Sequence, residues 1–104
     1  MEASDTHHVV YVEANTVPIV QKYIHRCIRQ LPEYCLALER QNFSFLIQEA
    51  HKIKGTGALM GVLELHVLGQ QLEMAARAND AAELQIKLSA LEHFLKTVAI
   101  AAQV

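Results

Sequence analysis

The amino-acid sequence predicts an all-α protein, an antiparallel four-helix bundle that follows a short N-terminal lead-in. Apolar residues recur every three or four positions through most of the chain, and its 104 residues include only four glycines and two prolines. The breaks between the apolar stripes are short, as in bundles of antiparallel neighbours. We expect a single domain over residues 1–104, with residues 1–9 flexible, a β-leaning extended segment at 9–12, and the bundle at about 16–100.

The first helix is expected to begin at Val17. Thr16 can cap it, and Pro18 lies in its first turn, where a missing N–H group costs nothing. Its apolar stripe consists of Val17, Val20, Ile24, Cys27, Leu31, Cys35 and Leu38. Pro32 interrupts this helix because it removes the hydrogen bond to the carbonyl of Ile28, so we expect a kink or a break between these two residues.

Three further stripes predict three further helices. The second helix should begin between Asn42 and Ser44 and weaken near Gly57, with the seam Leu46, Ala50, Ile53, Gly57 and Met60. The third should begin near Gly61, with the seam Val62, Leu65, Leu68, Leu72 and Ala75. Asp80 and Glu83 have the spacing of a capping box, which predicts the start of the last helix. Its seam is Leu84, Leu88, Leu91, Leu95 and Val98.

Charge and composition exclude several classes of function. The nine Lys and Arg residues are scattered and the net charge is −2, so we expect no nucleic-acid partner. No apolar run is long enough to span a membrane, and we expect no membrane association and no signal segment. Cys27 and Cys35 are too far apart along one helix for a disulfide, and no Cys-x-x-Cys pair suggests zinc. A reducing cytoplasm is therefore the expected location.

The segment from His51 to Gly61 carries the clearest chemistry. His51 lies beside the core seam of its helix, Lys54 follows one turn later on the same face, and Gly55 and Ala58 leave that face free of bulk. An exposed imidazole beside a cation, on a surface open to close approach, suits a carrier of a labile phosphoryl group. We interpret the chain as a phosphocarrier rather than a complete enzyme.

The third helix offers partners for the His51 ring through a polar stripe at spacings of four, three and four. This stripe consists of His66, Gln70, Glu73 and Arg77. A neutral imidazole nitrogen is a good nucleophile, and an acceptor on the other nitrogen would fix the tautomer and leave Nε2 to attack. Either Gln70 or Glu73 can be that acceptor, and Lys54 can attract the phosphoryl oxygens. Ile47, Gly55 and Ala58 surround the ring and form the expected docking face.

These residues match the pattern of a known family. The chain resembles the histidine-containing phosphotransfer (HPt) domains of multistep phosphorelays, over roughly residues 10–98. Their pattern of His, two residues, Lys, Gly, small residues, an apolar residue and Gly is met by His51, Lys54, Gly55, Met60 and Gly61. Further matches are Val17-Pro18, Leu68-Gly69 and Leu72-Glu73. Pro32, and Gly57 where Ser or Ala is commoner, depart from the pattern.

The resemblance implies a carrier that moves a phosphoryl group on His51 between aspartates of response-regulator receiver domains, fed by a hybrid histidine kinase. It implies a monomer without a kinase or nucleotide site and without a cofactor of its own, with the catalytic Mg²⁺ on the partner receiver. In chemotaxis-type relatives a Glu binds the unphosphorylated ring nitrogen, and Glu73 falls at its offset. Other members carry Gln there and at the place of Gln70.

A helical bundle of this size could also serve two other classes of function. A di-iron enzyme needs paired Glu-x-x-His motifs, and this sequence has no Glu followed by His at that spacing, so no metal site is expected. A bundle that docks a receiver or kinase without carrying phosphate is the alternative. The intact pair of His51 and Lys54 argues against it.

Overall fold

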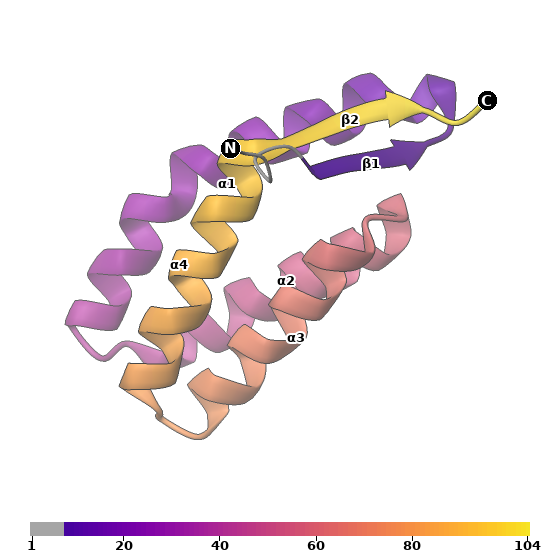
Figure 1. Cartoon of the computed structure of the whole chain (residues 1–104). Helices are drawn as coiled ribbons and strands as arrows, with labels where there is room; N and C mark the ends of the chain where they lie inside the picture. Colours follow the sequence, from indigo (N-terminus) through magenta and orange to yellow (C-terminus); the bar gives the residue numbers. More distant parts are fainter. Residues whose placement is uncertain (1–7) are drawn as a thin grey trace, which may run out of the picture.

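The structure, a computed structural model, describes residues 8–104. The helices are α1 (Val17–Glu39), α2 (Phe43–Met60), α3 (Leu63–Arg77) and α4 (Ala81–Thr97) (Figure 1). The remaining elements are the strands β1 (His8–Val12) and β2 (Val98–Ala102) and the short 3-10 helix η1 (Ala14–Thr16). The described part is thus mostly helical with four helices, as the sequence predicts.

The sheet is where the expectation of an all-α fold was wrong. β1 and β2 pair in parallel, with His8 opposite Val98 and Val12 opposite Ala102. Val98, expected in the last helix, therefore begins a strand, and the expected extended lead-in is one half of a sheet. Of the residues expected to be flexible, 8 and 9 lie in β1, and 1–7 lie outside the described residues. Parallel strands need a long crossover, which here is the whole set of helices.

Pro32 does not break α1, which runs without interruption from Val17 to Glu39. Figure 1 shows that this helix changes direction along its length, from the strands toward α4. Its two halves remain packed because Leu31 and Tyr34, on either side of the proline, are both buried. The predicted stripe is wrong at one position, since Tyr34 faces the core and Cys35 is exposed.

Side-chain caps are found at the starts of α2 and α4, and of these only the cap at Asp80 is predicted by the sequence. The Asn42 side chain accepts a hydrogen bond from the Phe45 amide at 3.2 Å, and Asp80 accepts one from the Glu83 amide at 3.0 Å. These bonds satisfy N–H groups that have no partner within the helix. Thr16 precedes α1 but makes no capping bond, because its backbone is already helical at the end of η1.

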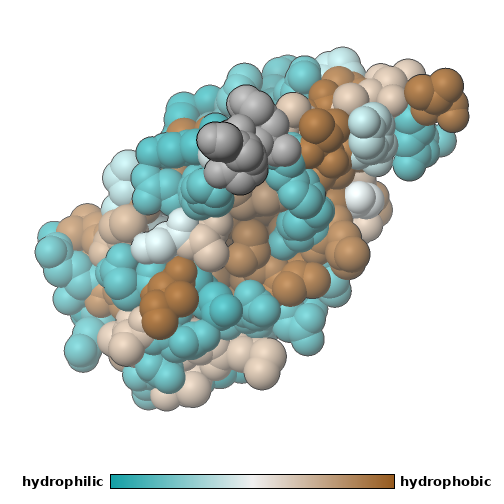
Figure 2. Space-filling model, viewed as in Figure 1, coloured by the Kyte–Doolittle hydropathy of each residue, from teal (hydrophilic) through white to brown (hydrophobic). Residues whose placement is uncertain are grey.

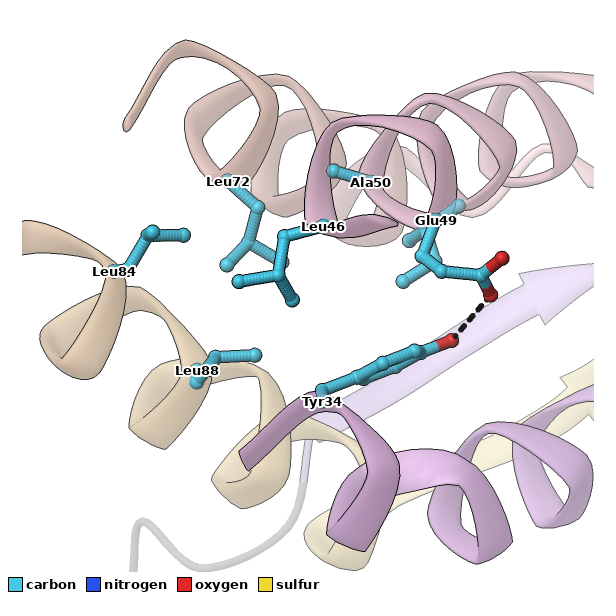
Figure 3. A pocket seen from close by; sticks show the side chains of 8 residues that line it. Tyr34, Leu46, Glu49, Ala50, Leu72, Leu84 and Leu88 are labelled. Carbon is cyan, nitrogen blue, oxygen red and sulfur yellow. Dashed lines mark hydrogen bonds between the residues drawn. The ribbon is translucent and has the colours of Figure 1, made fainter. Parts of the chain in front are cut away.

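Residues from all four helices meet in the core, as Figure 3 shows. Leu46 of α2 and Leu72 of α3 lie near Leu84 and Leu88 of α4, and each of these leucines is at least 96% buried. Tyr34 enters from α1, and its hydroxyl lies 3.3 Å from Oε1 of Glu49 and 3.1 Å from Oε1 of Gln30. The polar end of a large buried ring is thereby satisfied.

Two glycines let α2 and α3 approach closely. A Cβ on Gly69 would lie 2.4 Å from the backbone nitrogen of Lys54, and one on Gly57 would lie 2.6 Å from that of His66. Real Cβ atoms essentially never show such contacts with backbone. The interpretation that Gly57 weakens the end of its helix was wrong, because α2 continues to Met60 and Gly57 is buried against α3. α2 ends at Gly61, whose φ of 76° suits glycine.

The first prediction compares two glycines of these helices. Gly69→Ala should destabilise the protein by about 1–3 kcal/mol, because the new methyl group overpacks a backbone contact. Gly55→Ala is the matched control, since nothing lies within 4 Å of its added Cβ. Alanine at this helical position should raise the free energy of unfolding by up to about 1 kcal/mol. Urea unfolding measures both, and equal effects would contradict the close contact.

Candidate functional site

The sequence of α2 places His51 on its outer face. Ala50 and Ile53 point into the core and are almost fully buried, so the residue between them along the helix faces away from it. The side chain of His51 is 69% exposed. The seam predicted for this helix is correct, and it presents an imidazole to solvent on a rigid element.

One nitrogen of the His51 ring faces a buried carboxylate. Nδ1 lies 3.4 Å from Oε1 and 3.3 Å from Oε2 of Glu73, which belongs to α3. The Glu73 side chain is only 9% exposed, so packing fixes its position. A carboxylate accepts hydrogen bonds, and this contact therefore favours the tautomer with the proton on Nδ1.

Lys54 lies beside the same carboxylate. Its Nζ is 3.7 Å from Oε1 of Glu73, a looser contact than a direct hydrogen bond, and its side chain is 34% exposed. The backbone beneath it is held by α3, because Nδ1 of His66 lies 3.2 Å from the Lys54 carbonyl. The backbone at Lys54 is thus fixed, whereas the Lys54 ammonium group makes only a weak contact with Glu73.

Arg77 completes the charge arrangement one helical turn after Glu73. Its Nη2 and Nε atoms donate hydrogen bonds to Oε2 of Glu73 at 2.9 Å and 3.3 Å. This guanidinium group is the largest cause that holds the pKa of Glu73 below its ordinary value, and burial acts in the opposite direction. Hydrogen bonding to His51 and the charges of His51 and Lys54 lower it further. Glu73 is an ionised carboxylate at neutral pH.

The remaining predicted site residues lie apart from this cluster. Gln70 is exposed, and within residues 8–104 its side chain makes no hydrogen bond to His51. Of the two acceptors that the sequence left open, the structure brings Glu73 to the ring. Ile47 is half-buried against the core, whereas Gly55 and Ala58 are exposed beside the ring on α2.

Two residues that shape this site were not identified from the sequence alone. Arg77 was placed on the polar stripe of the third helix, but its bond to Glu73 was not predicted, although their spacing of four residues is a known signal for ion pairs. Gly69 was recognised as part of a motif, yet its contact with the Lys54 backbone depends on two helices at once. Only the assembled structure shows that contact.

A comparison with protein-family models matches residues 18–101 to the Hpt domain. The chain belongs to the Hpt domain family. The match covers most of the chain, from the first turn of α1 to β2. Comparisons with curated proteins and with solved structures gave no match.

Membership places the chain among the phosphocarrier domains of phosphorelays, which act with receiver domains and are not enzymes themselves. The helical part of the fold agrees with this family. No helix between residues 8 and 104 is long and apolar enough to cross a membrane. In the same part of the chain, no three His, Cys, Asp or Glu side chains are grouped as metal ligands would be.

The second prediction concerns Glu73 and pH. Because its pKa is lower in the folded protein than the ordinary value of 4.5, the ionised carboxylate contributes stability above that pH, and the contribution is lost as the pH falls through the folded value. Glu73→Gln should therefore lower the free energy of unfolding at pH about 5.5 and make a much smaller difference at pH about 3.

Chemical unfolding of wild type and variant at both pH values measures this difference. Glu92→Gln is the control, because Glu92 forms an exposed ion pair with Lys96 and such pairs contribute little. A deficit of Glu73→Gln that is the same at both pH values would show that the charge of Glu73 is not its cause.

Proposed function

We propose that this protein carries a phosphoryl group on His51 and passes it between aspartates of receiver domains in a two-component phosphorelay. The observation that supports this most directly is the His51 ring itself, 69% exposed, with Nδ1 facing the buried carboxylate of Glu73. A ring held in this way offers its other nitrogen, Nε2, to a partner. Membership of the Hpt domain family gives the same role in general terms.

In the proposed reaction, neutral Nε2 of His51 attacks the phosphorus of an aspartyl phosphate on the receiver. The N–P bond forms as the P–O bond to the aspartate breaks, and the carboxylate leaves with the electron pair. The proton on Nδ1 stays in its hydrogen bond to Glu73, so the transfer needs no general base. Lys54, with its weak contact to Glu73, is placed to approach the phosphoryl oxygens and balance their charge.

The receiver is proposed to dock on the face formed by Ile47, Gly55 and Ala58. Nothing lies within 4 Å of a Cβ built on Gly55, so this surface is open to a partner's aspartate. Apolar surface continues beyond Ala58, where Leu59 is 88% and Leu63 is 68% exposed. Figure 2 shows brown, apolar surface gathered over α3 and the strands. An apolar contact around a charged reacting centre would exclude water from the transfer.

The proposal includes several further expectations. The carrier acts as a monomer, receives its phosphoryl group through a hybrid histidine kinase, and relies on Mg²⁺ bound by the receiver, with no cofactor of its own. Its four helices form an antiparallel bundle, which the short connections between them support. It works in the cytoplasm, a location consistent with the two free thiols, Cys27 and Cys35.

The third prediction tests the carrier role directly. His51→Gln should fold like wild type, because the side chain is exposed, but should accept no phosphate from a panel of phosphorylated receiver domains. Acid-labile labelling measures acceptance, and circular dichroism checks the fold. His93→Gln, an exposed position on α4, is the control and should accept phosphate normally. Acid-labile phosphate that persists on His51→Gln would refute the proposal, whereas receiver binding without labelling of wild type would favour the alternative docking role.

The fourth prediction tests the docking face. Gly55→Trp should abolish transfer while helicity and melting temperature stay nearly unchanged, because its side chain would extend into open space beside the ring. In-line transfer needs the two reacting atoms within about 3–3.5 Å, which an indole on this face prevents. Ala90→Trp, at an exposed position of α4, is the matched control. Transfer by Gly55→Trp at a rate near that of wild type would mean that the receiver approaches from another direction.

A further inference from the structure

Glu73 has two opposing effects on His51. Its carboxylate orients the ring by accepting a hydrogen bond at Nδ1, which prepares Nε2 as the nucleophile. A negative charge 3.3 Å from an imidazole also favours the doubly protonated imidazolium, which has no free lone pair and cannot attack phosphorus. The carboxylate that orients the ring therefore also opposes the neutral form of the ring that attacks.

Two cations from the neighbouring helices face this carboxylate. Lys54 reaches from α2, at 3.7 Å from Oε1 and without a hydrogen-bonding distance. Arg77 reaches from α3 with two donors on Oε2, the shorter at 2.9 Å. If Lys54 moves to the phosphoryl group, as the proposed function requires, it cannot remain the counter-charge of Glu73 during transfer. Arg77 already places two of its donors on Glu73.

We propose that Arg77 is a positioning residue for phosphotransfer: its guanidinium group holds Glu73 in place and offsets its charge, so that Glu73 orients His51 without driving it to the imidazolium form. Arg77 acts through Glu73 and does not touch the phosphoryl group. The arrangement also frees Lys54 to leave the carboxylate when phosphate arrives. This inference rests on the proposed function for its rate measurements, but its effect on the ring is measurable in the unphosphorylated protein.

The first test is a titration of His51 by NMR, which follows the ring nitrogens of the unphosphorylated protein. Arg77→Gln should make His51 take up its second proton at a higher pH than in wild type, by about one pH unit. Arg77→Lys, which keeps the charge, should restore most of the wild-type behaviour. Arg29→Gln, an exposed arginine of α1, is the control for a general loss of charge.

A double-mutant cycle keeps the test specific to Glu73. In a Glu73→Gln background, the further change Arg77→Gln should shift the titration of His51 clearly less than in the wild-type background, because only the direct charge of Arg77 then acts on the ring and no carboxylate is left for Arg77 to hold in place. A shift of the same size in both backgrounds would overturn the proposal, and so would a titration of Arg77→Gln identical to that of wild type. If Arg77→Gln fails to fold, Arg77→Met takes its place in the cycle, and Arg77→Lys remains the variant that keeps the charge.

The second test is the rate of transfer from a phosphorylated receiver as a function of pH. At pH about 6.5, Arg77→Gln should be slower than wild type, by at most about tenfold for a shift of one pH unit, and the deficit should be smaller at pH about 8.5, because a higher pH removes the second proton from the ring. A deficit equal at both pH values would indicate a merely structural role and overturn the proposal. If wild type accepts no phosphate, the proposed function fails, and the NMR titration still decides the role of Arg77.

Discussion

The close packing of α2 against α3 is the constraint on which the site depends. Gly69 lets α3 contact the backbone of α2 at Lys54. Gly57 lets α2 contact the backbone of α3 at His66. This short separation lets the Glu73 carboxylate on α3 reach the His51 ring on α2 while the Glu73 side chain stays buried, with only 9% of it exposed. The two glycines therefore shape the site by setting the distance between α2 and α3, although neither touches the His51 ring.

Burial of Glu73 determines how the charges around it are arranged. An ionised carboxylate away from water is costly unless cations and donors surround it, and here His51, Lys54 and Arg77 all lie within 4 Å. Their contacts are unequal, from the 2.9 Å bond of Arg77 to the 3.7 Å approach of Lys54. The tight partner, Arg77, fixes the carboxylate. Under the proposed function, the loose partner, Lys54, would leave it for a phosphoryl group at little cost.

The four helices and the outward position of His51 were predictable from the sequence, because both depend on the spacing of residues along one helix. Apolar periodicity locates the buried seam, and the position of His51 beside that seam follows directly. β2 was not predictable in the same way, since Val98–Ala102 continues the apolar pattern of the last helix and pairs with residues about ninety positions earlier. The choice between Gln70 and Glu73 likewise required the rotation of α3 relative to α2, which spacing along one helix does not define.

The two nitrogens of the His51 ring have different surroundings. Nδ1 points inward to a carboxylate that packing holds in place, whereas most of the His51 side chain remains open to solvent. If His51 is the nucleophile, as we propose, a partner would meet a ring whose tautomer is already favoured by Glu73, on a helix whose neighbouring surface is cleared by Gly55. Preorganisation of this kind would lower the barrier to the proposed transfer, because the ring need not be oriented during the encounter. In the proposed function, the receiver would then have to supply only the groups that a surface histidine lacks, namely the metal ion and the leaving carboxylate.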